Sequence, residues 1–191
     1  MEQQTFKREP AKRIFAAEFR GIKFSEKFST DDKAPTFVLS PTGEIAARLL
    51  IVGVLTDKER TTTKDKANTI YKGRINDGTG DFFVSASSFQ PEAMMQIARI
   101  DTPAIVSIIG KPKLFTREDG NHFVSVNIES ITTADRETRD MWKLDTAFMT
   151  LSRIATMEKG EIQAYKNIKE KYSTNLETYK GMVNKALTRS I

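Results

Sequence analysis

The 191-residue chain contains no cysteine, one histidine and one tryptophan. Without cysteine there can be no disulfide, no thiolate catalysis and no zinc site built from cysteine, and this composition is typical of a reducing compartment, so we expect a cytoplasmic location. No apolar run approaches the roughly 20 residues that span a bilayer. The first residues, MEQQTFKREPAKR, lack the apolar segment of a secretory signal. We therefore expect neither a membrane span nor export.

Positively charged residues are in only small excess over negatively charged ones. The chain has 30 Lys and Arg against 25 Asp and Glu, which gives a formal net charge of +5. Such a balance permits a polyanionic partner without requiring one. Hydrophobic residues make up 39% of the chain and charged residues 29%, which is typical of a folded domain with a modest core under a charged surface.

The residue patterns of common catalytic sites are also missing. The single histidine, His122, has no cysteine nucleophile to activate. The segment Gly110-Lys111-Pro112 lacks the upstream glycine, the Ser or Thr and the helix start of a phosphate-binding P-loop. Asp77 and Asp81 bracket a turn, where we expect solvated carboxylates. We expect no enzymatic activity, no metal and no cofactor.

What the chain does contain is a series of strand patterns. Branched and aromatic residues concentrate in segments 45–56, 69–76, 81–89, 104–115 and 122–132, with turn residues between them. Pro91 opens a short helix between the third and fourth segments. Five strands with a helix in this place predict an oligonucleotide-binding (OB) barrel. We expect a mainly β fold with C-terminal α structure: an N-terminal arm (1–43), the OB domain (44–134), a long helix (135–159), to which the family resemblance given below assigns oligomerisation, and a helical tail (160–191).

From residue 135 the apolar period changes to about 3.5, typical of a helix with an apolar seam. The seam consists of Met141, Leu144, Phe148, Leu151 and Ala155, with Trp142 and Met149 beside it. It must be buried, either against the end of the barrel or against partner subunits, and its spacing does not decide between them. In the tail, Thr174-x-x-Glu177 predicts a capping box and a helix restart near Ser173.

Alternation along the strands predicts which side chains point out of the barrel. If Ile75 and Phe82 face the core, Lys72, Arg74 and Phe83 face solvent. The closing hairpin adds the outward set Lys111, Lys113, Phe115, Arg117 and Phe123. Exposed aromatic rings among cations are what base stacking and phosphate neutralisation require. Each phenylalanine alone could equally be a core residue or a subunit contact, and a bulge could exchange Tyr71 with Lys72.

Several segments between residues 8 and 155 resemble the archaeal replication protein A family, in particular its small OB-fold subunits, the replication protein A-associated proteins. They are REPAKRIFAAEF (8–19), AP (34–35), SPTGEIAARLLIVGVLT (40–56), INDGTGDFFVSASSFQPEA (75–93), PAIVSIIGKPKLF (103–115), VNIESIT (126–132) and TRDMWKLDTA (138–147). The first and last of these are the most specific. The resemblance does not extend into the tail.

The resemblance implies a subunit of a single-stranded DNA-binding complex that acts in DNA replication, repair and recombination. It also implies that the helix after the barrel joins helices of other subunits, a role that would fall on Met141, Trp142, Leu144, Phe148, Leu151 and Ile154. Two alternatives remain open at this point: a scaffold subunit with little DNA binding of its own, and an RNA-binding OB module.

Overall fold

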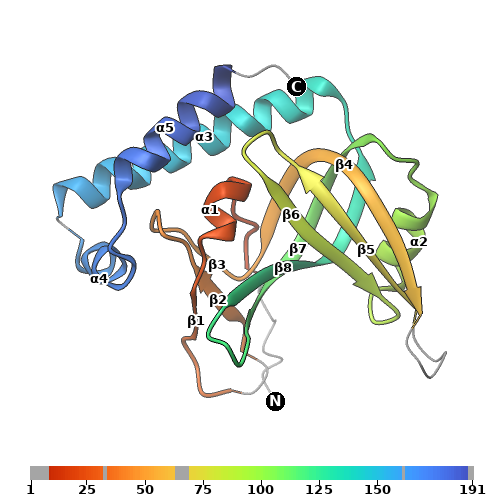
Figure 1. The fold of residues 1–191 in the computed structure, drawn as a ribbon, viewed down its shortest axis with the longest axis horizontal. Helices are drawn as coiled ribbons and strands as arrows, with labels where there is room; N and C mark the ends of the chain where they lie inside the picture. The colour runs from red at the N-terminus through yellow and green to blue at the C-terminus, as the bar shows by residue number, and fades with distance from the viewer. Residues whose placement is uncertain (1–8, 32–33, 63–68, 161, 189–191) are drawn as a thin grey trace, which may run out of the picture.

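Five strands close into a barrel in the computed structural model, which describes residues 9–31, 34–62, 69–160 and 162–188 (Figure 1). The barrel strands are β4 (Leu49–Thr62), β5 (Thr69–Asn76), β6 (Asp81–Ser87), β7 (Ala104–Thr116) and β8 (His122–Thr133). Their order around the barrel is β4-β5-β6-β8-β7, and only the β6–β8 pair is parallel. This confirms the predicted OB barrel. Residues 1–8 of the expected arm and 189–191 of the expected tail lie outside the described residues.

Helix α2 (Pro91–Arg99) begins at Pro91, as predicted, and packs against the barrel. Its Ala93 and Ile97 belong to the same core cluster as the inward residues Ile75 and Phe82 of the barrel. At the C-terminal end of the helix, Lys58 Nζ donates to the carbonyl oxygens of Ile97 (3.1 Å) and Ala98 (2.7 Å). The charge of Lys58 thus satisfies carbonyls that the helix itself leaves free.

Strand β4 contains a glycine, Gly53, at a place where it lies very close to β5. A Cβ at Gly53 would lie 2.6 Å from the carbonyl oxygen of Asn76, so only glycine allows β4 and β5 to approach this closely. A bulge follows between Leu55 and Asp57. The predicted first strand, 45–56, is in fact two strands, the short β3 (Ile45–Ala46) and β4, which continues to Thr62.

A small second sheet was not predicted. It consists of β1 (Phe24–Lys27), β2 (Thr36–Leu39) and β3, in that order. Its strands are four, four and two residues long, too short for alternation to identify them. Between the start of the arm and this sheet lies helix α1 (Ala16–Arg20), and Ile14, Phe19 and Ile22 pack into the core of the barrel. The arm is therefore an integral part of the barrel's packing.

Three helices complete the chain: α3 (Arg136–Lys159), α4 (Gln163–Tyr172) and α5 (Leu176–Thr188). The Asp135 side chain caps α3 by accepting from the backbone N–H of Thr138 (2.7 Å), and Gly160 ends the helix with a left-handed conformation. Helix α5 lies beside α3 along one side of the barrel (Figure 1). Its Val183 and Ala186 share a core cluster with Trp142.

The predicted capping box at the start of α5 is wrong, although the helix break is where it was expected. Ser173 has a left-handed conformation that ends α4. The Thr174 hydroxyl donates to the carbonyl of Pro41 (3.2 Å) instead of capping the helix, and the Asn175 side chain accepts from the N–H of Glu177 (3.1 Å). The hydroxyl therefore joins the tail to the arm, and the cap moves one residue along the chain.

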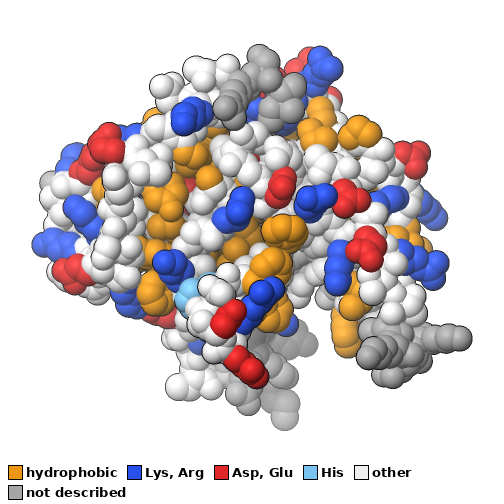
Figure 2. Space-filling model, in the orientation of Figure 1, with side chains coloured by type: hydrophobic (Ala, Val, Ile, Leu, Met, Phe, Trp, Pro, Cys, Tyr) orange, Lys and Arg blue, Asp and Glu red, His pale blue; other side chains and the backbone are white. Residues whose placement is uncertain are grey.

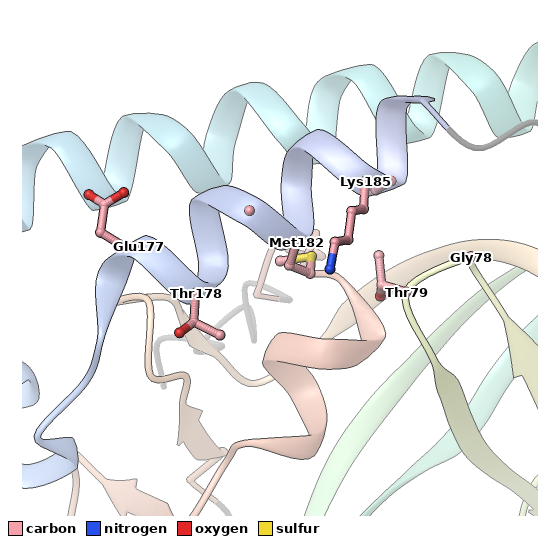
Figure 3. A pocket seen from close by; sticks show the side chains of 8 residues that line it. Gly78, Thr79, Glu177, Thr178, Met182 and Lys185 are labelled. Atoms are coloured by element: carbon pink, nitrogen blue, oxygen red, sulfur yellow. The ribbon is translucent and has the colours of Figure 1, made fainter.

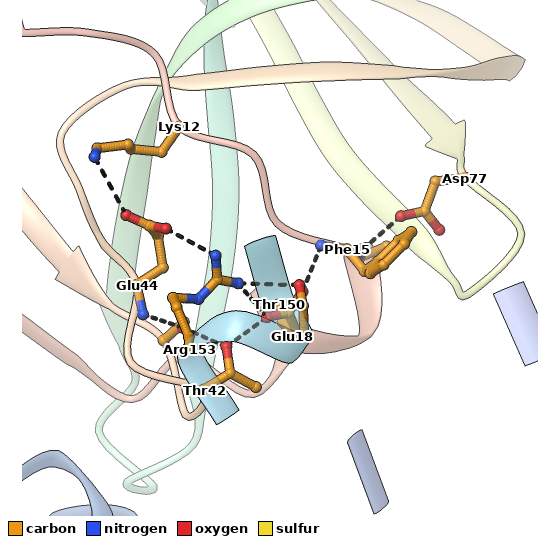
Figure 4. Close-up of polar contacts among 10 residues, drawn as sticks. Lys12, Phe15, Glu18, Thr42, Glu44, Asp77, Thr150 and Arg153 are labelled. Carbon is orange, nitrogen blue, oxygen red and sulfur yellow. Dashed lines mark hydrogen bonds and ion pairs between the residues drawn. The ribbon is translucent and has the colours of Figure 1, made fainter. Parts of the chain in front are cut away.

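A buried ionic network joins the arm to α3 (Figure 4). Glu18 is fully buried, and Arg153 Nη2 lies 2.8 Å from its Oε1. The other guanidinium nitrogen of Arg153 lies 2.9 Å from Glu44. Glu18 also accepts from the Thr42 and Thr150 hydroxyls and from the backbone N–H of Phe15. Buried charges require such compensation, so the network fixes α3 against the barrel.

Candidate nucleic-acid interface

Three phenylalanine rings form a row across the outer surface of the barrel. Phe83 on β6 and Phe123 on β8 have ring centroids 5.5 Å apart. Phe115 on β7 pairs with Phe123 across the strands. The exposed fractions of Phe83, Phe115 and Phe123 are 39%, 42% and 38%. Figure 2 shows hydrophobic side chains over the region of strands β6 and β8, with Lys and Arg side chains near them.

Strand alternation causes this exposure. Phe82 and Val84, which flank Phe83, are buried at 0% and 3% exposure, and Val124 beside Phe123 is 6% exposed. Each strand fills the core with one face, so the next residue must point outward. The predicted facing of Lys72, Arg74 and Phe83 is confirmed, and Tyr71 packs against the core without exchanging places with Lys72.

Cations lie at both ends of the aromatic row. Arg74 pairs with Phe83 between β5 and β6. At the other end, Lys113 Nζ lies 4.7 Å from the centroid of the Phe115 ring. A base stacked on any of the three rings would therefore have its phosphate within reach of a positive charge.

A second row of polar and basic residues runs parallel to the first. Lys72 pairs with Ser85, Ser85 with Asn127, and Asn127 with Lys111 across β5, β6, β8 and β7. The Ser85 hydroxyl donates to the Asn127 side-chain oxygen (3.1 Å). The aromatic and basic residues of the two rows form one surface. We call these seven residues the platform: Lys72, Arg74, Phe83, Lys111, Lys113, Phe115 and Phe123.

The platform keeps a positive charge that carboxylates cancel only in part. Arg74 lies 3.3 Å from Asp57, and Lys111 lies 3.6 Å from Glu129, which also pairs with Arg48. The side chains of Arg74 and Asp57 are about half exposed, so their ion pair is weak. A phosphate could therefore replace Asp57 as the partner of Arg74. Lys72 and Lys113 form no ion pair with any residue that the structure describes.

Arg117 lies just beyond the end of β7, two residues after Phe115 of the aromatic row. It is in the turn of the β7–β8 hairpin, where its backbone N–H donates to the carbonyl of Asn121 (2.9 Å). Its side chain is exposed. The eight residues expected to bind DNA therefore divide into seven that the fold brings together and one at the tip of a hairpin.

Asp77 is not solvated, contrary to expectation. It is fully buried, and its carboxylate accepts from the backbone N–H of Ala16 at 2.7 Å, of Thr79 at 2.8 Å and of Gly80 at 3.2 Å. Burial raises the pKa of Asp77, and these hydrogen bonds oppose the rise. The turn, in which Gly78 has a φ of +95°, is therefore anchored to helix α1. Its role is structural, and its amides are occupied.

Phe89 is a further exposed aromatic residue that the sequence did not single out. It lies directly after β6, and its 85% exposure is the largest among the exposed hydrophobic residues of the described chain. It continues the series of alternate residues Phe83, Ser85 and Ser87 along β6, and this continuation is the signal that could have identified it. A fully exposed ring at the end of the platform's central strand can stack on a base.

The side chains expected to form subunit contacts fall into two groups. Trp142 and Ile154 are 3% and 0% exposed, because they pack within the chain itself. Trp142 Nε1 donates to the carbonyl of Leu50 (2.9 Å), and Ile154 packs against the small sheet and α4. Met141, Leu144, Phe148 and Leu151 are exposed at 60%, 55%, 74% and 40%. We call these four residues the open α3 face.

Among the described residues, no group of three His, Asp or Glu side chains is placed to hold a metal ion. Within the same residues, no helix is long and apolar enough to cross a membrane. The cytoplasmic location stays a prediction.

Comparisons with known proteins find similarity in structure only. No family model matches the chain, and no curated protein matches its sequence. A chain from the structure of a replication protein A heterotrimer bound to ssDNA has a TM-score of 0.50 at 16% identity, covering 76% of this chain and 98% of that chain. The second single-stranded DNA-binding protein (SSBb) of Mycobacterium smegmatis has a TM-score of 0.39 at 16% identity, covering 47% and 87%. A chain of yeast Stn1 and Ten1 has a TM-score of 0.43 at 12% identity, covering 59% and 56%. The similarity to the heterotrimer chain shows that this protein has the OB fold.

Proposed function

We propose that this chain is a non-enzymatic subunit of a complex that binds single-stranded DNA. The platform receives the DNA, and the open α3 face receives helices of other subunits. The observation that carries the first part is the continuous row of Phe83, Phe123 and Phe115, with Arg74 at one end and Lys113 at the other. Stacking on rings and neutralisation of phosphates are the two interactions that sequence-independent strand binding needs.

The more specific assignment is a small OB-fold subunit of an archaeal replication protein A-like complex, acting in DNA replication, repair and recombination. The resemblance of residues 8–155 to that family supports it, as does the order of a barrel followed by a long helix. Because RNA presents the same bases and phosphates, competition between oligo-dT and oligo-rU for the protein separates this proposal from an RNA-binding role.

The DNA proposal predicts a change in salt dependence. Replacing Lys72, Arg74 and Lys113 together by alanine removes three phosphate contacts, so the slope of log affinity against log salt concentration becomes shallower by about 2. Fluorescence anisotropy of labelled oligo-dT over a salt series measures this slope. A matched control replaces Lys159, Lys166 and Lys169, three exposed lysines of α3 and the tail, by alanine. An equal change of slope in the control would contradict the assignment to the platform.

The assembly proposal rests on the open α3 face. A strip with Phe148 at 74% exposure on a well-capped helix is typical of a surface that another protein covers. Trp142 and Ile154 are not part of it, since the barrel and tail bury them. Deleting the tail is unsuitable as a test, because Val183 and Ala186 of α5 pack against Trp142 in the core.

Introducing charge on the open α3 face is expected to release the subunit from its complex. Leu144→Glu with Phe148→Glu would bury two carboxylates in an apolar interface, which is strongly unfavourable. The tagged double variant, purified from the cells in which the chain occurs, should sediment as a single chain of 21.6 kDa, while the wild type sediments as a larger complex. Arg136→Glu, at an exposed position in the first turn of α3 outside the open α3 face, is the control and should remain in the complex. A double variant that keeps the mass of the wild-type complex contradicts the proposal.

A further inference from the structure

A cavity of about 440 Å³ lies between the β5–β6 turn and helix α5 (Figure 3). Gly78 and Thr79 of the turn form one side. One face of α5 forms the other, through Glu177, Thr178, Gly181, Met182, Lys185 and Ala186. These residues follow the i, i+4, i+8 spacing of a single helix face, so the cavity runs along α5 for about 12 Å.

Gly181 keeps this cavity open. A Cβ at Gly181 would meet no atom within 4 Å, so no contact with the residues that the structure describes requires glycine there. Glycine is unfavourable in the middle of a helix compared with alanine. Its presence leaves room on the cavity side of α5 for a group from outside the chain.

The charges around the cavity are unbalanced. Lys185 extends from α5 into the cavity, and it forms no ion pair within the described chain (Figure 3). Arg20 of α1 lies against the same turn, with its Nη1 3.8 Å from the place of a Cβ on Gly80, and it too has no ion pair with a described residue. Two cations from different helices therefore flank the turn.

The carboxylates nearby do not neutralise these cations. Glu177, at the far end of the cavity, is paired with Lys180 at 2.8 Å. Asp77 is fully buried beneath the turn, and its carboxylate already accepts from the backbone N–H groups of Ala16, Thr79 and Gly80. Lys185 and Arg20 are therefore the cations beside the turn that no described carboxylate pairs with, and they favour an anionic ligand.

The position of the turn indicates which anion. Arg74 and Phe83 of the platform lie three residues before and three residues after the turn, which is about 10 Å along a strand. A DNA strand that leaves the platform past this pair reaches Arg20 and Lys185 next. We propose that the cavity is a phosphate site that extends the single-strand path from the platform onto helix α5; this rests on the proposed function.

The site recognises the backbone of the strand and not its sequence. The turn amides are already used, by Asn76 for Gly78 and by Asp77 for Thr79 and Gly80. The Thr79 hydroxyl donates to Asp77 and accepts from the N–H of Ala17. The two cations and the Thr178 hydroxyl are left to interact, and a phosphodiester is the group on every nucleotide that they fit.

The test compares Lys185→Ala with Lys169→Ala, which removes the same charge from an exposed position of α4 outside the cavity. Both are titrated with oligo-dT of about 8 nucleotides, which one OB fold covers, and of about 25 nucleotides, which extends beyond it. Lys185→Ala should weaken binding of the longer strand about fivefold and make its salt slope shallower by about 0.7. It should leave the shorter strand unaffected. Lys169→Ala should match the wild type with both.

A second variant, Gly181→Leu, fills the cavity without changing charge and should weaken binding of the longer strand alone. If the wild type binds both strands and neither Lys185→Ala nor Gly181→Leu changes the affinity or the slope, the phosphate site is overturned and the platform stands. The phosphate site is also overturned if the variants keep their DNA affinity and lose only the binding of a protein partner. A wild type that binds neither strand overturns the proposed function and the site with it.

Discussion

Replacing Phe83 and Phe123 together by alanine is expected to lower the affinity for oligo-dT by about 30-fold or more. Stacking on one aromatic side chain contributes about 1–3 kcal/mol per base, and the two rings offer adjacent stacking surfaces. Because each ring is more than one third exposed, the barrel core keeps its packing in the double variant. Anisotropy titration measures the affinity, and thermal unfolding verifies that the variant is folded.

The matched control is Phe28→Ala. Phe28 is 62% exposed and has its own aromatic neighbour, Phe37, at 5.1 Å, but it lies beyond β1, next to the small sheet. Its loss should leave DNA affinity unchanged. An equal loss of affinity in the control, or no loss in the double variant, would place the nucleotides elsewhere.

The largest effect on stability is expected for Arg153→Leu. The substitution leaves Glu18 without the cation that lies 2.8 Å from it in a fully buried position, and Glu44 loses the same partner. Removing one member of a buried ion pair costs about 3–5 kcal/mol in the free energy of unfolding. Urea denaturation monitored by Trp142 fluorescence gives this value. Arg136→Leu, which removes an exposed arginine from the first turn of the same helix, is the control and should change it little.

The cost of Arg153→Leu should depend on pH. Burial raises the pKa of Glu44, and the charge of Arg153 opposes that rise. Without the arginine, the folded-state pKa of Glu44 rises further above its unfolded value, so the folded variant binds a proton more readily than the unfolded chain. Stability then falls as pH rises. The difference between variant and wild type should be smaller at about pH 5 than at about pH 8, and a difference that grows toward low pH would contradict the network's role.

The platform could be predicted from sequence because it depends on local alternation. Phe82 and Phe83 are neighbours, so once one fills the core the other must face outward. The OB barrel could be predicted from five strand patterns with a helix between the third and the fourth. Both inferences use only residues close in the chain and the period of a strand.

The role of Asp77 could not be predicted in this way. Its carboxylate accepts from the N–H of Ala16, 61 residues away, and nothing in the turn sequence indicates that helix α1 would cover it. The same holds for Arg153, whose partner Glu18 lies 135 residues earlier. Buried polar pairs between distant segments leave no periodic pattern in the sequence.

Helix α3 could be predicted from the sequence only in part. The period of about 3.5 correctly indicated a helix with an apolar stripe, but it does not say which neighbours cover that stripe. The barrel and α5 cover Trp142, and the small sheet with α4 covers Ile154, while Leu144 and Phe148 remain exposed. Because the tail showed no resemblance to the family, its packing on α3 could not be anticipated.

Photocrosslinking tests the central claim most directly. Oligo-dT carrying 5-iododeoxyuridine, bound to the protein and irradiated, couples to aromatic side chains in contact with its bases, and mass spectrometry identifies the residues. The platform predicts crosslinks at Phe83 and Phe123, with Phe89 or Phe115 at the neighbouring nucleotides. Crosslinks confined to α3 or the small sheet, or none from a strand that is bound, would contradict the claim that this barrel face binds single-stranded DNA.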